Sequence, residues 1–124
     1  GQIRTLLGRL CRFHLWEPVT FGTGKPLPYD EALKEYGKNI KRAFTYKALN
    51  RLIQGSAADQ TKKAMLDCYN EGLTPMLTVH DELCFNIESQ EQTARIKEIM
   101  ETGVPLKVPS KIDVDIKDDW GEIE

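Results

Sequence analysis

The sequence has no apolar run long enough to cross a membrane and no signal-peptide pattern. Its net charge is only −2 over 124 residues, so any nucleic-acid-binding surface would have to be local. Cysteine is scarce, and Cys11, Cys68 and Cys84 fit neither a zinc-binding spacing nor a disulfide framework. We therefore expect reduced cysteines and a cytoplasmic protein.

The remaining composition is that of an ordinary globular chain, with 40% hydrophobic and 29% charged residues. A chain of this length forms one small domain or part of a larger one, with a modest core. Gly1 stands where an initiator Met would be expected, which suggests a processed product, an excised region or a tagged chain.

A predicted β-hairpin is the most informative local feature. Two short apolar runs, Met76–Val79 and Leu83–Ile87, flank the polar triplet His80, Asp81 and Glu82. Adjacent carboxylates repel each other unless they are solvated or share a cation, and carboxylate oxygens suit Mg²⁺. The triplet therefore predicts either a metal-binding tip or a solvated turn.

The first residues predict a second, smaller hairpin. Gly8 interrupts two short apolar-containing runs within Gln2–Phe13. Arg4, Arg9 and Arg12 give this segment local positive charge, which indicates either a solvated edge or contacts with a nucleic-acid backbone.

The next stretch combines a predicted loop with a predicted short helix. Prolines and glycines punctuate Leu15–Pro28, which predicts a loop. Tyr29–Tyr36 favours a helix that ends at Gly37.

A long helical region is predicted from Lys41 to Glu71, followed by Gly72 as a C-terminal stop. Ser56 and Asp59 have capping-box spacing, so the helix could restart near Ser56. The pattern leaves open whether this region is one helix or two.

A further helix is predicted after the acidic hairpin. Ser89 and Gln92 form a capping box, and the helix should end near Gly103. Its apolar stripe consists of Ile96, Ile99 and Met100.

The last part of the chain favours extended structure. Two prolines forbid a helix in Val104–Pro109. Apolar and acidic residues alternate over Ile112–Ile116, which predicts a half-buried strand with Asp113 and Asp115 on its solvated side. Trp120 is expected to pack as an anchor.

Two separated motifs carry a resemblance to a known family. The segment Leu49–Met65, L-N-R-L-I-Q-G-S-A-A-D-Q-T-K-K-A-M, is followed by T-V-H-D-E-L at Thr78–Leu83. This pair resembles the carboxy-terminal part of family A DNA polymerases, the relatives of bacterial DNA polymerase I and of bacteriophage replicative polymerases. T-L-L-G-R at Thr5–Arg9, V-P-L at Val104–Leu106 and D-D-W at Asp118–Trp120 are similar to further segments of that family.

The resemblance implies an α+β fold, in which an antiparallel palm sheet with an acidic-tipped β-hairpin packs against helices. Residues 1–124 would form a C-terminal palm portion with a loop insertion at about 16–36. The implied partners are primer–template DNA, deoxynucleoside triphosphates and the remaining polymerase chain, and no membrane. If the polymerase is a phage enzyme, it would act in the cytoplasm of the host cell.

The resemblance also assigns roles to individual residues. Asp81 would bind the catalytic Mg²⁺ ions, Glu82 would support the metal site, and His80 would lie near the primer 3′ end. Asn50 and Gln54 would donate hydrogen bonds to minor-groove acceptors, which occur in every base pair and so report pairing geometry.

Several departures from the family pattern limit these assignments. Tyr46 stands where many members carry Arg or His, so the charge is lost although a phenol can still donate one hydrogen bond. Leu52 replaces the usual Pro between Asn50 and Gln54. The family's D-Y-S-x-I-E-like segment, with its other catalytic Asp, and its R-x-x-x-K-x-x-x-[FY]-G helix are absent from these 124 residues. We therefore expect a chain that is inactive alone.

Two alternatives remain open. A small Mg²⁺-dependent nuclease would use Asp81 and Glu82 together with Asp113 and Asp115. A non-catalytic module would only bind duplex, through Asn50, Gln54 and the N-terminal arginines, and would not lose function on Asp81→Asn.

Overall fold

The computed structural model describes residues 1–122 of the chain. The chain divides into two compact units, Gly1–Asp59 and Gln60–Glu124. Within the described residues, no helix combines the length and the apolar character that a membrane span requires.

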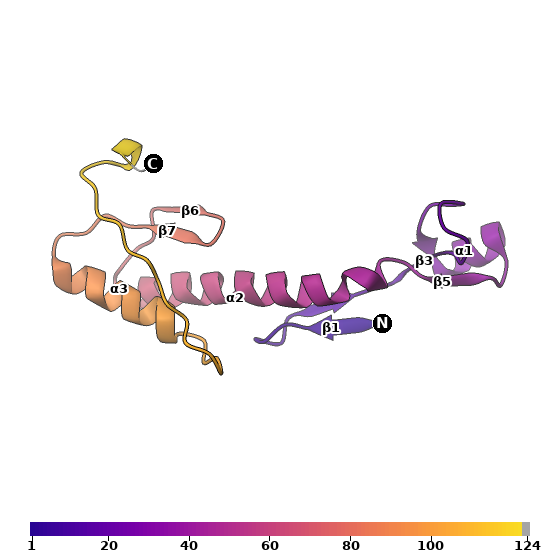
Figure 1. Ribbon diagram of the computed structural model, residues 1–124, viewed down its shortest axis with the longest axis horizontal. Helices are drawn as coiled ribbons and strands as arrows, with labels where there is room; N and C mark the ends of the chain where they lie inside the picture. Colours follow the sequence, from indigo (N-terminus) through magenta and orange to yellow (C-terminus); the bar gives the residue numbers. More distant parts are fainter. Residues whose placement is uncertain (123–124) are drawn as a thin grey trace. The chain divides into compact units, whose positions relative to one another are not determined.

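The secondary structure confirms the predicted α+β class (Figure 1). The helices are α1 (Tyr29–Tyr36), α2 (Ala48–Asn70) and α3 (Gln90–Thr102), with short 3-10 turns at η1 (Thr45–Lys47) and η2 (Trp120–Glu122). The strands are β1 (Gln2–Arg4), β2 (Leu10–Arg12), β3 (Leu15–Pro18), β4 (Leu27–Pro28), β5 (Ile40–Arg42), β6 (Leu77–Val79) and β7 (Glu82–Cys84). They form three small antiparallel sheets, β1–β2, β4–β3–β5 and β6–β7.

The hairpin predicted at the start of the chain is confirmed. Strands β1 and β2 pair with Ile3 opposite Cys11. Gly8 lies in the turn with φ of 87°, a conformation that glycine adopts without steric cost. Phe13 follows β2, and its side chain is one of the buried apolar groups of this unit.

The loop predicted for Leu15–Pro28 is wrong, because this stretch contributes strands β3 and β4 to a three-stranded sheet. Pro18 and Pro28 are each the last residue of their strand, where a missing N–H does little damage to the ladder. The stretch between these strands is irregular, and its Lys25 is held by backbone hydrogen bonds to and from the Tyr36 hydroxyl.

The predicted bounds of α1 and its stop at Gly37 are confirmed, but the helical start at Lys41 is wrong. Lys41 lies in β5, which pairs with β3. Phe44 then has φ of 62°, which is incompatible with a right-handed helix. The long helix therefore begins only at Ala48.

Helix α2 is one continuous helix, which resolves the choice between one helix and two (Figure 1). The predicted restart near Ser56 is wrong, since Ser56 lies inside the helix and its hydroxyl accepts a hydrogen bond from the Leu6 amide. Gly72 has φ of 81° just past the helix end, so the predicted stop is confirmed.

The second unit has its own apolar core. Cys68 on α2 packs with Ile96 and Ile99 on α3, and partly buried side chains surround them: Leu73, Phe85, Ile87 and Met100. The predicted capping box is confirmed, because the Ser89 hydroxyl accepts from the Gln92 amide and the Gln92 side chain accepts from the Glu88 amide.

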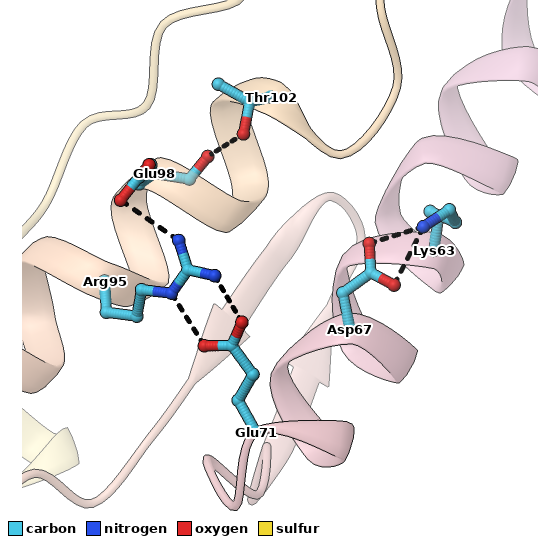
Figure 2. A network of polar contacts seen from close by, with 6 residues as sticks. All are labelled: Lys63, Asp67, Glu71, Arg95, Glu98 and Thr102. Carbon is cyan, nitrogen blue, oxygen red and sulfur yellow. Dashed lines mark hydrogen bonds and ion pairs between the residues drawn. The ribbon is translucent and has the colours of Figure 1, made fainter.

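Charged side chains connect the same two helices at their exposed rim (Figure 2). Arg95 on α3 donates two hydrogen bonds to the Glu71 carboxylate just after α2, and it also pairs with Glu98 at 3.1 Å. Within α2, Lys63 contacts both carboxylate oxygens of Asp67. Only the Arg95–Glu71 pair joins α3 to the end of α2, and both of its side chains remain in contact with solvent.

Two predictions near the C-terminus are wrong. Residues 112–116 form no regular strand, and both Val114 and Ile116 are exposed, because within residues 1–122 no other strand pairs with them. Asp113 and Asp115 are solvated, as expected. Trp120 is 60% exposed and does not pack as an anchor among the described residues.

Candidate functional site

The acidic hairpin has a tighter turn than the sequence predicted. Val79 pairs with Glu82, so only His80 and Asp81 form the connection, and Glu82 is the first residue of β7. His80 has φ of 54°. Of the two turn residues, only His80, the first, has positive φ. This is the pattern of a type II′ turn, whose backbone twist matches that of paired strands. Asp81 is thereby fixed at the tip of the hairpin.

The side chains of His80, Asp81 and Glu82 are all exposed. Carboxylate oxygens are the ligands that Mg²⁺ prefers, so Asp81 and Glu82 fit such an ion chemically. No group of three or more His, Cys, Asp or Glu side chains within residues 1–122 is arranged to hold a metal ion. The hairpin therefore offers a partial set of ligands at an accessible edge.

A second candidate surface lies at the start of α2, in the first unit. Tyr46 in η1 and Asn50 and Gln54 in α2 are all exposed. Residues four apart on a helix are neighbours on one face, so the two amide side chains form a row of hydrogen-bond donors. Such a row can approach a flat or grooved ligand along the helix axis.

The turn between β1 and β2 is bound to α2 by polar contacts, of which the one between Thr5 and Asp59 is buried. The buried Asp59 carboxylate accepts hydrogen bonds from the Thr5 hydroxyl and, at 2.8 Å, from Arg9 Nε. Arg9 Nη2 donates to the Gly55 carbonyl at 3.1 Å. The Leu6 amide donates to Ser56 Oγ at 3.1 Å.

The absence of a side chain at Gly55 favours this close approach. A Cβ at this position would lie 3.0 Å from Thr5 Cγ2 and 3.5 Å from Arg9 Nη2. We call residues 5–9, together with the three α2 residues that hold them, Gly55, Ser56 and Asp59, the turn–helix clamp. The contact of Asp59 with the turn was not predicted from the sequence, although a run of small residues beside an acidic one on a helix is a usable signal for a buried contact.

The predicted site residues fall into two groups, one in each unit. Tyr46, Asn50, Gln54 and Arg9 belong to the first unit, and the hairpin triplet belongs to the second. Arg9 was predicted to contact DNA. Its guanidinium contacts Asp59 and Gly55, and about half of the side chain is exposed, so the DNA contact stays a prediction.

Comparison with known proteins identifies the family. The family model described as DNA polymerase family A matches residues 1–122. The chain belongs to this family. It is 42% identical over 121 residues to a DNA-directed DNA polymerase of Pseudomonas phage M6, which covers 98% of the chain and 15% of that relative.

Thermostable DNA polymerases I are also similar to this family A chain. The protein of Thermus aquaticus is 39% identical over 90 residues, and that of Thermus filiformis is 35% identical over 92 residues. These matches cover 67% and 68% of the chain, and each covers 11% of the relative. The chain therefore spans only a small part of the length of these polymerases. No solved structure is a significant match.

Family membership gives the two groups of residues a common context. The segment with Asn50 and Gln54 and the hairpin with Asp81 are the two motifs on which the resemblance was based. Both lie in well-defined local structures, an exposed helix face and a tight hairpin.

Proposed function

We propose that this chain is the C-terminal palm portion of a DNA-directed DNA polymerase and contributes part of the site for template-directed deoxynucleotidyl transfer. Membership of family A supports this role. The observation that carries the proposal is the two-residue turn that fixes exposed Asp81 at the tip of β6–β7, where it can reach groups outside these residues. The proposed substrates are primer–template DNA and deoxynucleoside triphosphates.

Asp81 would hold Mg²⁺ directly, and Glu82 would support it from the first position of β7. When bound, a pair of metal ions would stabilise the charge that develops on the attacking and leaving oxygens. The remaining ligands would come from a segment outside these 124 residues, because two carboxylates supply too few oxygens. We therefore propose that the isolated chain is inactive and that the remaining polymerase chain completes the site.

Asn50, Gln54 and Tyr46 would contact the primer–template duplex. Purine N3 and pyrimidine O2 accept hydrogen bonds at every base pair, so amide donors along a helix can check pairing geometry without reading sequence. The exposure of these side chains supports this role, because none of them would have to leave a packed position to reach DNA. His80, beside Asp81, would lie near the primer 3′ end.

The test is single-turnover primer extension by the polymerase that contains this chain, titrated with Mg²⁺. Asp81→Asn keeps the side-chain shape and removes the charge, so extension should fall about 100-fold to 1,000-fold or more. Glu82→Gln should cause a smaller loss. Asp113→Asn is the matched control, because Asp113 is exposed in an irregular segment and its charge should not matter.

Near-normal extension by Asp81→Asn would reject the proposal and favour a module that only binds duplex. A severe defect at Asp113 or Asp115 would favour the nuclease alternative instead. No observation supports that alternative at present, since within residues 1–122 these carboxylates form no metal-binding group with Asp81 and Glu82.

A further inference from the structure

Charge is distributed unevenly along the chain. Residues 1–59 carry ten basic and five acidic side chains, whereas residues 60–124 carry seven basic and fourteen acidic ones. Between Glu35 and Asp59 there is no acidic residue, and five basic residues fall in this interval: Lys38, Lys41, Arg42, Lys47 and Arg51. Half of the ten basic residues of the first unit therefore fall between the end of α1 and the first turn of α2, where no acidic residue accompanies them.

Three of these cations lie over aromatic rings. Arg42 stacks over Trp16 with 4.8 Å between Cζ and the ring centroid, and Arg51 lies 5.1 Å from the centroid of Phe13. Lys47 Nζ lies over the Phe44 ring at 5.1 Å. Stacking occupies the face of a guanidinium but leaves most of its N–H groups in the guanidinium plane able to donate.

Arg42, Lys47 and Arg51 are exposed, and within residues 1–122 none of them forms an ion pair with a carboxylate. Lys47 ends η1 and Arg51 lies in the first turn of α2, so two positive charges fall close together along the chain with no acidic residue between them. Arg42 and Arg51 share Phe13 as a neighbour, since Arg42 Nη1 donates to the Phe13 carbonyl at 2.9 Å. Positive side chains that lie close together without carboxylate partners repel one another, so a bound anion stabilises them.

We propose that Arg42, Lys47 and Arg51 form a phosphate-binding row that holds the sugar–phosphate backbone of duplex DNA. This inference rests on the proposed function, which supplies the duplex as partner. Successive residues of an α-helix are about 100° apart, so Arg51 lies on the row of α2 next to Asn50 and Gln54. Lys47 directly follows Tyr46 in η1, at the end of the chain segment that leads into this row.

The geometry of the minor groove matches two adjacent rows. The groove is only about 6 Å wide and is bordered on both sides by phosphates. A helix that directs amide donors into the groove therefore brings the neighbouring row against one backbone. Phosphate contacts of this kind position a protein on DNA without reading sequence, as a polymerase requires.

The test measures binding of the 124-residue chain to a fluorescein-labelled primer–template duplex over a range of salt concentrations. In the triple variant Arg42→Gln, Lys47→Gln, Arg51→Gln, the slope of log affinity against log salt should decrease by about 0.9 for each phosphate that the variant no longer neutralises. If the variant no longer neutralises three phosphates, its binding is less sensitive to salt. Raising the salt from about 50 to 200 mM should then weaken wild-type binding about 40-fold more than it weakens binding by the variant.

The control variant removes the same charge elsewhere, by Lys25→Gln, Lys34→Gln and Lys117→Gln, all at exposed positions. The proposal is overturned if the control reduces the slope equally, if the triple variant leaves the slope unchanged, or if the wild-type chain does not bind duplex at low salt. Single variants, checked for helix content by far-UV circular dichroism, should each reduce the slope by about one third of the triple effect.

A separate measurement distinguishes failure of this inference from failure of the proposed function. Asp81→Asn should reduce extension by the polymerase at least about 100-fold and leave the salt slope of the chain unchanged. Suppose that Asp81→Asn extends primers normally while the triple variant still has a smaller salt slope than the wild type. This result would reject the catalytic role and retain the phosphate-binding row.

Discussion

Removing the Asp59 carboxylate should loosen the turn–helix clamp and destabilise the first unit. Asp59 is 7% exposed and accepts from the Thr5 hydroxyl and from Arg9 Nε. The bond from Thr5 is buried and charge-assisted, which is typically worth about 1.5–3 kcal/mol. Arg9 is half exposed, so its ion pair adds about 0–1 kcal/mol. Asp59→Ala should therefore cost about 2–4 kcal/mol of unfolding free energy.

The assay combines urea unfolding of the chain with amide hydrogen exchange. In Asp59→Ala the amides of Leu6 and Arg9 should exchange faster, because they donate to Ser56 Oγ and Thr5 Oγ1 inside the clamp. The Met76 amide, which donates to the Cys84 carbonyl beside the acidic hairpin, is the internal control and should be unaffected.

Two variants separate the clamp from a general effect of charge. Asp113→Ala removes an exposed carboxylate and should leave the urea midpoint unchanged. Thr5→Val removes the hydroxyl at nearly constant volume, and a double-mutant cycle with Asp59→Ala should give a coupling of about 0.5–3 kcal/mol. Wild-type stability and wild-type exchange at Leu6 in Asp59→Ala would refute the reasoning, since the buried contacts would then contribute nothing.

Two further predictions concern the core and rim of the second unit. Burial raises the pKa of the Cys68 thiol, so it should react with a disulfide reagent more slowly than the half-buried Cys11 and Cys84, and equal rates would contradict this. Hydrogen bonds from Arg95 lower the pKa of Glu71 below its ordinary value of 4.5, so their stabilising effect is present above that pH and is lost as pH falls through the lower folded-state pKa. Arg95→Gln should therefore reduce the acid-side fall of the melting temperature, and an unchanged pH profile would contradict this.

Local sequence signals predicted the C-terminal ends of α1 and α2 and the start of α3, although they placed the start of α2 too early. Gly37 and Gly72 adopt positive φ just past α1 and α2, and the Ser89–Gln92 capping box begins α3. Each signal depends on groups within a few residues of one another, so the local sequence alone contains the groups that form the helix cap or stop. The acidic hairpin was predictable for the same reason, because its strands are joined by a two-residue turn.

Long-range pairing could not be inferred in the same way. Strand β5 exists because Arg42 pairs with Trp16, far upstream, and nothing near Lys41 in the sequence indicates this partner. Conversely, the alternating pattern over Ile112–Ile116 favours a strand but finds no partner within residues 1–122. Alternation of apolar and polar residues shows that a segment could pack on a sheet. The neighbouring strand with which it would pair has to come from elsewhere in the chain.

The segment Q-G-S-A-A-D shows why a motif on a helix should be divided by face before a role is assigned to it. Gln54 is exposed and able to meet a duplex, whereas Gly55 and Asp59, further along the same helix, contact the turn between β1 and β2. Because the helix turns by about 100° per residue, neighbours in the sequence serve different surfaces. A change at Gln54 should therefore alter duplex contacts and spare stability, and a change at Asp59 should do the reverse. The resemblance contains both residues in one motif, and the helix geometry places them on different surfaces.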